Sequence, residues 1–239
     1  MSSDAKGTLY LLPNTLGETA ADAVIPGAVL DRARLLDYFI AEDPKSARAF
    51  LKRIGSARAL QDIHIERLDH NTRTSDIASL LEPVLAGRDA ALLSEAGMPA
   101  IADPGANLVR LAHQRGARVV PLTGPSSILL ALCASGLEGQ RFAFHGYLPV
   151  AEAELVKALK RLERDSQRLK QTQIFIETPY RNERTLGTTV RTLAPHTLLC
   201  VASDLTLATE SVRTQTVAAW REQPPRLKGR PSVFLLLAR

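Results

Sequence analysis

This 239-residue sequence has few cysteines and lacks the residue spacings typical of metal sites. The two cysteines, Cys133 and Cys200, lie among apolar residues and are too few to form a metal cluster, so we expect buried free thiols. The histidines show neither H-x-x-x-H nor H-E-x-x-H spacing. These absences argue against the usual zinc hydrolases, and we expect no bound metal.

Long apolar runs and common cofactor motifs are also missing. No apolar segment reaches the roughly 18 to 20 residues needed to cross a bilayer, and the N-terminus does not resemble a signal peptide. We therefore expect a cytoplasmic protein with no membrane partner. The sequence lacks G-x-G-x-x-G after its first apolar run and G-x-x-x-x-G-K-[ST] throughout, which argues against a dinucleotide site and a P-loop.

The composition is that of an ordinary globular protein, with 45% hydrophobic and 23% charged residues. The formal net charge of +5 is compatible with an anionic partner such as nucleic acid, but it does not establish one.

Apolar runs and helical patterns alternate along the chain. Runs typical of buried strands lie at residues 7–12, 38–41, 63–68, 89–94 and 117–122. This alternation predicts a parallel, doubly wound α/β sheet. The later part of the chain ends in a strand, a short helix and a last strand, which predicts a mixed second sheet. We therefore predict two α/β lobes, residues 1–122 and 123–239.

Three loops follow predicted strands, where open α/β sheets bind their ligands. They are LPNTLGE at 12–18, SEAGMPAIADPG at 94–105 and LTGPSS at 122–127. The glycines and prolines of the second loop hold its backbone amides in a fixed, exposed path, or Asp103 simply caps the next helix. Ser126 and Ser127 open a helix whose first amides could bind a carboxylate or hydroxyl, although plain helix capping is the alternative.

Several segments occur in the order and spacing of one protein family. The loop after the first strand, SEAGMPAIADPG, VVPLTGPSS, ASGL at 134–137, FHGYLP at 144–149 and IFIETPYRN at 174–182 resemble the tetrapyrrole methylase superfamily, the class III S-adenosylmethionine-dependent methyltransferases. They are most similar to its branch of small-subunit ribosomal RNA ribose 2′-O-methyltransferases. That branch typically has Thr-Pro-Ile-Gly-Asn where this chain has Asn14-Thr15-Leu16-Gly17-Glu18, and Met98 replaces a common Thr or Asp.

The resemblance implies two α/β lobes with S-adenosylmethionine in the cleft between them, and a homodimer. Carried over residue by residue, it implies that the cofactor meets Pro13, Ala96, Gly97, Met98, Ile101, Ser126, Ser127, Glu177, Thr178, Pro179 and Ala202.

Methyl transfer from a sulfonium is an in-line displacement that depends mainly on alignment and exclusion of water. A ribose hydroxyl as nucleophile also needs a proton acceptor. The available carboxylates are Glu42, Asp43, Glu95, Asp103 and Glu177. Glu95 and Glu177 are the candidate catalytic residues, because each directly follows a predicted strand. Alternatively they bond to loop amides and support the cofactor site, while Glu42 and Asp43 cap the following helix.

Other polar residues are candidates for substrate contacts. His70 and Asn71 could contact the substrate from a loop or form a solvated turn. Tyr180 and Arg181 could stack on or pair with a substrate, or simply pack at the interface of the two predicted lobes. Four basic residues share one face of the helix predicted at 151–170: Lys157, Arg161, Arg164 and Arg168. That face either binds phosphates or is a solvated surface partly neutralised by Glu163 and Asp165.

Three functions remain open on these grounds. The first is a methyltransferase acting on a ribose 2′-hydroxyl of ribosomal RNA, with the RNA or the small ribosomal subunit as its partner. The second is a methyltransferase acting on a tetrapyrrole or another small molecule. The third is a protein that binds the cofactor without turnover, because the motifs describe cofactor binding more than chemistry.

Overall fold

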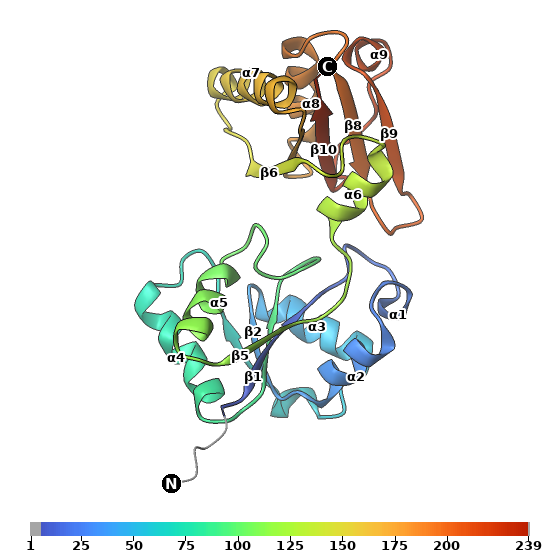
Figure 1. The fold of residues 1–239 in the computed structure, drawn as a ribbon. Helices are drawn as coiled ribbons and strands as arrows, with labels where there is room; N and C mark the ends of the chain where they lie inside the picture. The colour runs from blue at the N-terminus through green and yellow to red at the C-terminus, as the bar shows by residue number, and fades with distance from the viewer. Residues whose placement is uncertain (1–5, 239) are drawn as a thin grey trace. The chain divides into compact units, whose positions relative to one another are not determined.

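A computed structural model describes residues 6–238 of the chain. The chain divides into two compact units, Met1–Ser126 and Ser127–Arg239. Each unit contains its own sheet and its own helices (Figure 1).

The N-terminal unit is built on a five-stranded sheet in the order β3-β2-β4-β1-β5, in which every pairing is parallel. Its strands are β1 Thr8–Leu12, β2 Tyr38–Ala41, β3 His64–Arg67, β4 Ala90–Leu93 and β5 Arg118–Pro121. Its helices are α1 Ala21–Val24, α2 Gly27–Leu35, α3 Pro44–Ile54, the 3-10 helix η1 Leu60–Asp62, α4 Thr74–Leu85 and α5 Gly105–Gln114.

Helices cover both faces of this parallel sheet. Consecutive strand residues point to opposite faces, and apolar residues on each face pack against helices. Phe39 and Leu93 pack into one buried cluster with residues of α1, α2 and α3. Ile40 and Leu92, their immediate neighbours in sequence, pack into another cluster with residues of α4 and α5. Figure 1 shows α1 to α3 on one side of the strands and α4 with α5 on the other. The predicted doubly wound parallel sheet is confirmed.

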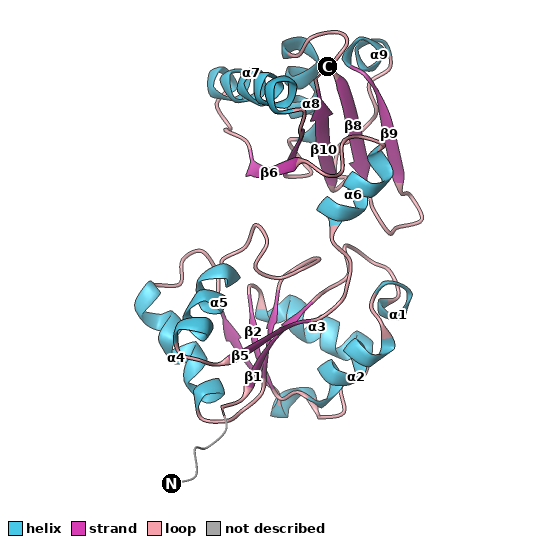
Figure 2. Ribbon diagram, viewed as in Figure 1, coloured by secondary structure: helices cyan, strands magenta, loops and turns pink. Residues whose placement is uncertain are grey.

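The C-terminal unit is built on a mixed sheet in the order β6-β7-β10-β8-β9 (Figure 2). Only the β6–β7 pairing is parallel among the described strands of this unit. The strands are β6 Phe142–Tyr147, β7 Thr172–Glu177, β8 Leu198–Ser203, β9 Ser211–Thr216 and β10 Ser232–Leu237. The helices are α6 Ser127–Ser135, α7 Glu152–Leu169, α8 Asn182–Thr192 and α9 Val217–Glu222. The predicted mixed sheet is confirmed.

The core of the C-terminal unit lies between the sheet and three of its helices. Phe175 of β7 and Phe234 of β10 stack with ring centroids 5.2 Å apart, and both are fully buried. Buried residues of α7, α8 and α9 complete this cluster. Trp220 of α9 is anchored to the sheet because its indole N–H donates to the Leu199 oxygen at 2.8 Å.

The structure corrects one expectation about the cysteines. Cys200 is buried in β8 as expected, whereas Cys133 of α6 is exposed. The helix carries apolar residues on every side, so its sequence gives no sign of which face is buried. In the structure Ala131 and Leu132 are buried while Leu129 is 51% exposed.

Within residues 6–238 no helix is both long enough and apolar enough to cross a membrane. The same part of the chain holds no group of three or more histidine, cysteine, aspartate or glutamate side chains placed to bind a metal ion.

Candidate functional site

Asn14 joins the loop after β1 to the loop after β4. The two strands are parallel neighbours, so their carboxyl ends lie at the same edge of the sheet. The Asn14 N–H donates to the Gly97 oxygen at 2.9 Å, and the Gly97 N–H donates to the Asn14 oxygen at 3.2 Å. The Asn14 Nδ2 donates to the backbone oxygens of Glu95 at 2.9 Å and Ser94 at 3.3 Å. The first two predicted ligand loops are therefore one connected structure.

Two glycines allow all three predicted loops to approach one another. Gly97 has a φ of +70°, and a Cβ there would lie 3.1 Å from Leu16 Cδ2 and 3.5 Å from the Pro125 oxygen. A Cβ at Gly124 would overlap Pro13, only 2.3 Å from its Cβ and Cγ. Larger side chains at these positions would force the loops apart.

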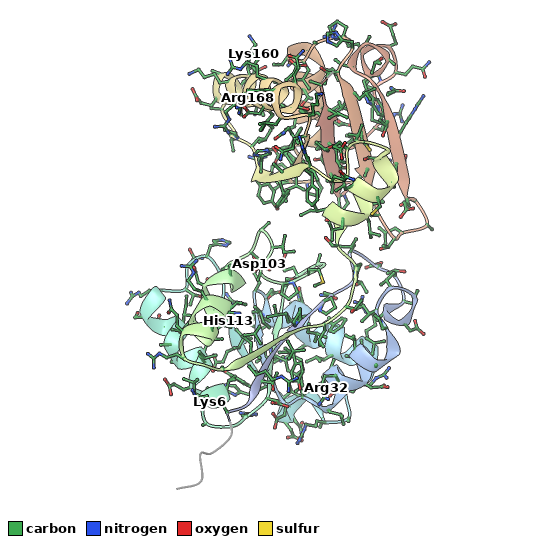
Figure 3. All side chains as sticks on the ribbon, in the orientation of Figure 1. Lys6, Arg32, Asp103, His113, Lys160 and Arg168 are labelled. Carbon is green, nitrogen blue, oxygen red and sulfur yellow. The ribbon has the colours of Figure 1, made fainter. Side chains whose placement is uncertain are left out.

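The loop after β4, residues 94–104, is called the β4 loop below. Asp103, labelled in Figure 3, holds the later part of this loop in place. Its carboxylate accepts hydrogen bonds from the Ala100 N–H at 2.8 and 3.0 Å and from the Gly105 N–H at 2.7 Å. Burial raises the pKa of Asp103, and these amide donors oppose the rise. Ala100 and Ala102 have φ values of +67° and +61°, which are unfavourable for non-glycine residues and persist only in a firmly held loop. Asp103 thus bonds to the first residue of α5, although the N-cap position itself is occupied by Pro104 and not by Asp103.

Part of the β4 loop is open to a ligand. Glu95 and Ala96 are exposed, and Ile101 is 46% exposed despite being apolar. Within residues 6–238 the backbone amides of Ala96 and Met98 donate to no other protein group. The loop therefore presents both apolar surface and unused amide donors.

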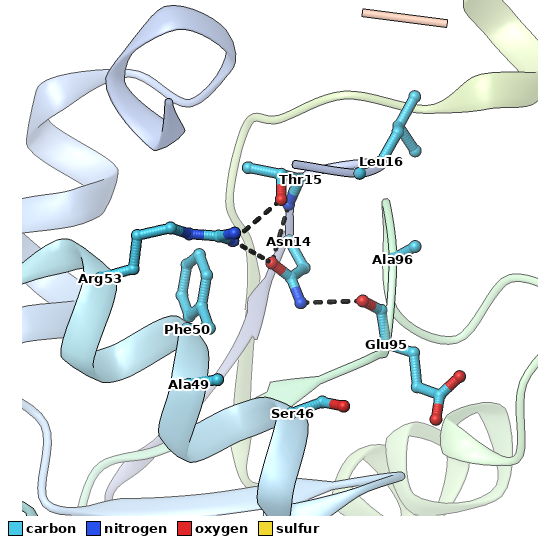
Figure 4. A pocket seen from close by; sticks show the side chains of 10 residues that line it. Asn14, Thr15, Leu16, Ser46, Ala49, Phe50, Arg53, Glu95 and Ala96 are labelled. Atoms are coloured by element: carbon cyan, nitrogen blue, oxygen red, sulfur yellow. Dashed lines mark hydrogen bonds between the residues drawn. The ribbon is translucent and has the colours of Figure 1, made fainter. Parts of the chain in front are cut away.

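A pocket of about 240 Å³ lies beside this loop within the N-terminal unit (Figure 4). The residues at 14–17 form one wall, and Ser46, Phe50 and Arg53 of α3 form another. Glu95 and Ala96 complete the lining.

Glu42 lies close to other acidic groups at this edge of the sheet. It follows β2, and its N–H donates to the Leu93 oxygen at the end of β4. Burial raises the pKa of Glu42, and the negative charges of Glu95 and Asp103 raise it further, while His70 opposes the rise. Glu42 is therefore a partly buried carboxyl beside the two loop carboxylates.

Asp43 has a different role, and the capping alternative is confirmed for it. Its carboxylate accepts from the Ser46 N–H at 3.0 Å, the Ser46 hydroxyl at 2.7 Å and the Lys45 N–H at 3.2 Å at the start of α3. The Ser46 hydroxyl and these amides lower the pKa of Asp43. The adjacent Glu42 does not cap the helix, so two neighbouring carboxylates serve different purposes.

Glu177 is at the centre of a hydrogen-bond network in the C-terminal unit. Its side chain is 5% exposed and pairs with Arg181, whose Nη2 and Nε donate at 2.6 and 2.9 Å. It also accepts from the Thr178 N–H at 2.7 Å and the Thr185 hydroxyl at 3.1 Å. The carboxylate therefore fixes the turn between β7 and α8. Tyr180 is 77% exposed, with the Arg181 guanidinium 5.6 Å from its ring centroid.

The other predicted cofactor residues of the C-terminal unit differ in accessibility. Ser127 is the first residue of α6, and Thr178 and Pro179 are half-buried. Ala202 is 1% exposed inside β8. In the N-terminal unit, Pro13 is buried and Ser126 is half-buried.

Two further groups of candidate substrate residues lie on the protein surface. His70 and Asn71 are exposed in a turn where the Asn71 N–H donates to Asp69, as a solvated turn requires. On α7, Lys157 pairs with Glu154 and Arg168 pairs with Asp165, while Lys160 and Arg168 extend from the helix surface (Figure 3). This pattern matches the partly neutralised face.

One neutralising residue was predicted wrongly. Glu163 accepts hydrogen bonds from the Ala194 N–H and the Thr197 hydroxyl beyond α8, so it does not pair with the basic face of α7.

Arg53 and the Asn14 side chain are functional candidates that sequence reasoning missed. Arg53 lies on the polar face of an amphipathic helix, where basic residues are common, and Asn14 stands in a loop of small and polar residues. Neither position differs locally from an ordinary surface residue, so only the fold reveals their contact.

The raised pKa of Glu42 leads to a prediction about stability. At a pH below the usual pKa of a glutamate, Glu42 is protonated in both the folded and the unfolded state. As the pH rises, Glu42 ionises in the unfolded chain before it does in the folded protein. The free energy of unfolding therefore falls. We expect Glu42→Gln to remove this loss, so that its urea midpoint exceeds that of the natural chain by an amount that grows between pH 4 and pH 7. Circular dichroism measures this, with Trp220 fluorescence reporting the C-terminal unit separately.

The exposed Glu82 of α4 provides the matched control for this substitution. The difference for Glu82→Gln should stay flat over the same pH range. A flat difference for Glu42→Gln as well would show that Glu42 is not desolvated in the folded protein.

Comparisons with known proteins place the chain in one family. Residues 20–220 match the model of the tetrapyrrole (corrin/porphyrin) methylases. The chain is 33% identical over 232 residues to ribosomal RNA small subunit methyltransferase I of Escherichia coli O157:H7, covering 95% of this chain and 77% of that protein. It is 34% identical over 211 residues to the protein of the same name from Mesorhizobium japonicum, covering 88% and 68%.

Two solved structures share the fold. The methyltransferase CobJ superposes with a TM-score of 0.64 at 17% identity, covering 98% of this chain and 94% of that chain. Uroporphyrin-III-C-methyltransferase from Thermus thermophilus superposes with a TM-score of 0.53 at 16% identity, covering 97% and 92%. With the family model matching most of its length, the chain belongs to the tetrapyrrole (corrin/porphyrin) methylase family and is a methyltransferase.

Proposed function

We propose that this methyltransferase uses S-adenosylmethionine to methylate a ribose 2′-hydroxyl of small-subunit ribosomal RNA. The observation that carries the proposal is the set of loops joined by Asn14 and Gly97 in a chain whose curated relatives are named for this RNA. The formal net charge of +5 is in keeping with an RNA substrate.

The loops of the N-terminal unit fit the proposed cofactor. S-adenosylmethionine offers many hydrogen-bond acceptors and an apolar edge, and the β4 loop offers unused amides at Ala96 and Met98 beside the exposed Ile101. We propose that these three residues, with Pro13, Gly97 and Ser126, bind the cofactor. In the C-terminal unit we propose Ser127, Glu177, Thr178 and Pro179, whereas the buried Ala202 offers no surface to the cofactor.

Glu95 is the proposed proton acceptor. When bound, S-adenosylmethionine supplies a methyl group on a sulfonium. The Glu95 carboxylate would accept the proton of the ribose hydroxyl that receives this methyl group. Glu95 is exposed at the pocket, so it can reach a hydroxyl there. The neighbouring Glu42 and Asp103 add negative charge around it.

Glu177 is the second candidate catalytic residue, and its contacts support a positioning role. The pairing with Arg181 and the bonds to Thr178 and Thr185 occupy both carboxylate oxygens. A carboxylate held in this way orders the Thr178–Pro179 turn more readily than it accepts a proton from a substrate.

A homodimer and a partnership with the small ribosomal subunit follow from the resemblance to the family, and they stay predictions, as does the cytoplasmic location expected from the sequence. Size-exclusion chromatography with light scattering measures the first directly.

The acceptor is tested by methyl transfer in vitro. The purified protein is incubated with methyl-labelled S-adenosylmethionine and an extract of cells that lack its gene, and RNA, protein and small molecules are then separated. We expect label in small-subunit ribosomal RNA. Label only in small molecules would favour a tetrapyrrole or other small acceptor, and cofactor binding without transfer would favour a binding protein.

Gly97→Val should abolish cofactor binding and leave the fold largely intact. The new side chain would be strained at a φ of +70° and would press on Leu16 and Pro125, which displaces the amides beside it. Titration calorimetry with S-adenosylmethionine measures the loss. Gly55→Val is the matched control, because Gly55 has a φ of +74° with open space around its Cβ position. Equal affinity in the Gly97 variant and the natural chain would refute the placement of the cofactor.

The two glutamates should respond differently to amide substitution. Glu95→Gln should lower kcat by about 100-fold or more with little change in cofactor affinity, because a proton acceptor acts only in the chemical step. Glu177→Gln should lower cofactor affinity and kcat together, because it loosens a binding turn. Single-turnover kinetics and cofactor titration separate these effects, with Glu82→Gln as control. A selective kcat loss at Glu177 would instead make it the catalytic residue.

A further inference from the structure

Arg53 extends from α3 into the pocket and is held there by two buried polar residues (Figure 4). Its Nη2 donates to the Thr15 hydroxyl at 2.9 Å and lies 3.5 Å from Asn14 Oδ1. Thr15 is 4% exposed and Asn14 is 5% exposed. The guanidinium also lies 5.7 Å from the ring centroid of Phe50. The protein therefore fixes the direction of this cation.

Arg53 has no acidic partner within residues 6–238. Other arginines do: Arg88 pairs with Asp37, Arg181 with Glu177 and Arg230 with Asp204. The remaining N–H groups of Arg53 are thus available to a ligand, and its charge is not neutralised by the protein.

Glu95 is the acidic residue that lines the same pocket, but it does not neutralise Arg53. Figure 4 shows its carboxylate pointing away from the guanidinium. Its charge acts on Glu42, whose pKa it helps to raise. The pocket therefore has a positive end at Arg53 and an acidic margin at Glu95.

The orientation of Asn14 links the positive end to the proposed cofactor loop. Asn14 Oδ1 accepts from the Thr15 N–H at 2.8 Å on the side of Arg53, while Nδ2 donates to the Glu95 oxygen. One side-chain amide thus sets the position of both the guanidinium and the β4 loop, which ties an anion-binding group to the proposed reaction site.

We propose that Arg53 binds a backbone phosphate of the RNA acceptor in this pocket. The inference rests on the proposed function. The guanidinium is anchored through Nη2 alone, so the N–H groups of Nε and Nη1 are left for phosphate oxygens. The pocket volume of about 240 Å³ suits a phosphorylated sugar better than a whole macrocycle. A small acceptor that places a carboxylate on Arg53 is the competing occupant.

The test measures how salt weakens the binding of small ribosomal subunits prepared from cells that lack the gene. Arg53→Gln should weaken binding by about ten-fold and reduce the slope of log affinity against log salt by about 0.7 to 0.9, the share of one phosphate. Arg53→Lys should retain most of the slope but bind less tightly, because it keeps the charge and loses the planar guanidinium that Thr15 holds in place. Cofactor affinity should remain within about two-fold in each variant.

Lys52→Gln is the matched control, since Lys52 is an exposed basic neighbour on the same helix that does not line the pocket. Its slope should equal that of the natural chain. If the natural chain methylates ribosomal RNA and Arg53→Gln keeps the full slope and affinity, the inference is overturned and the proposed function stands.

If the natural chain transfers no methyl group to ribosomal RNA, the proposed function fails and a smaller probe decides the inference. Thermal unfolding is then compared with uridine 5′-monophosphate and with uridine. Stabilisation that needs the phosphate and disappears in Arg53→Gln would support a phosphate site. Stabilisation independent of the phosphate, or label found in a carboxylated small molecule, would overturn it.

Discussion

The rest of the site depends on the hydrogen bonds that the Asn14 side chain makes. Parallel pairing of β1 and β4 brings two loop starts to one edge of the sheet, but it does not set how the loops continue. The buried amide of Asn14 does this through Glu95 on one side and through Thr15 and Arg53 on the other. Leaving such buried groups without partners costs about 1–3 kcal/mol each, so each of these hydrogen bonds favours the observed arrangement of the loops.

The two units order their proposed ligand loops by different physical means. The N-terminal unit relies on a neutral amide, two closely packed glycines and the Asp103 carboxylate, so its loop keeps exposed backbone amides. The C-terminal unit relies on the pair of the buried Glu177 and the half-buried Arg181. Removing Arg181 would leave the buried Glu177 carboxylate without its counter-charge, so the pair favours one arrangement of the turn.

The sequence predicted the sheets and the positions of the three loops that follow strands well, because both leave local signals. Period-two alternation places Phe39 and Ile40 on opposite faces, and glycine and proline mark the strand ends. It did not predict the pocket, since Arg53 and Thr15 are 38 residues apart in the chain. The sequence also did not predict which face of α6 is buried, because apolar residues lie on every side of that helix. It did not separate the roles of Glu42 and Asp43, because both are acidic residues just before α3.

The central claim is that Asn14 organises the proposed cofactor loop, and titration of S-adenosylmethionine into Asn14→Ala tests it most directly. The backbone bridge to Gly97 remains in this variant, so only the side-chain links are lost. We predict an affinity about ten-fold lower or weaker still, with Trp220 fluorescence showing an unchanged C-terminal unit. An affinity equal to that of the natural chain would contradict the account, because the β4 loop would then hold its binding shape without Asn14.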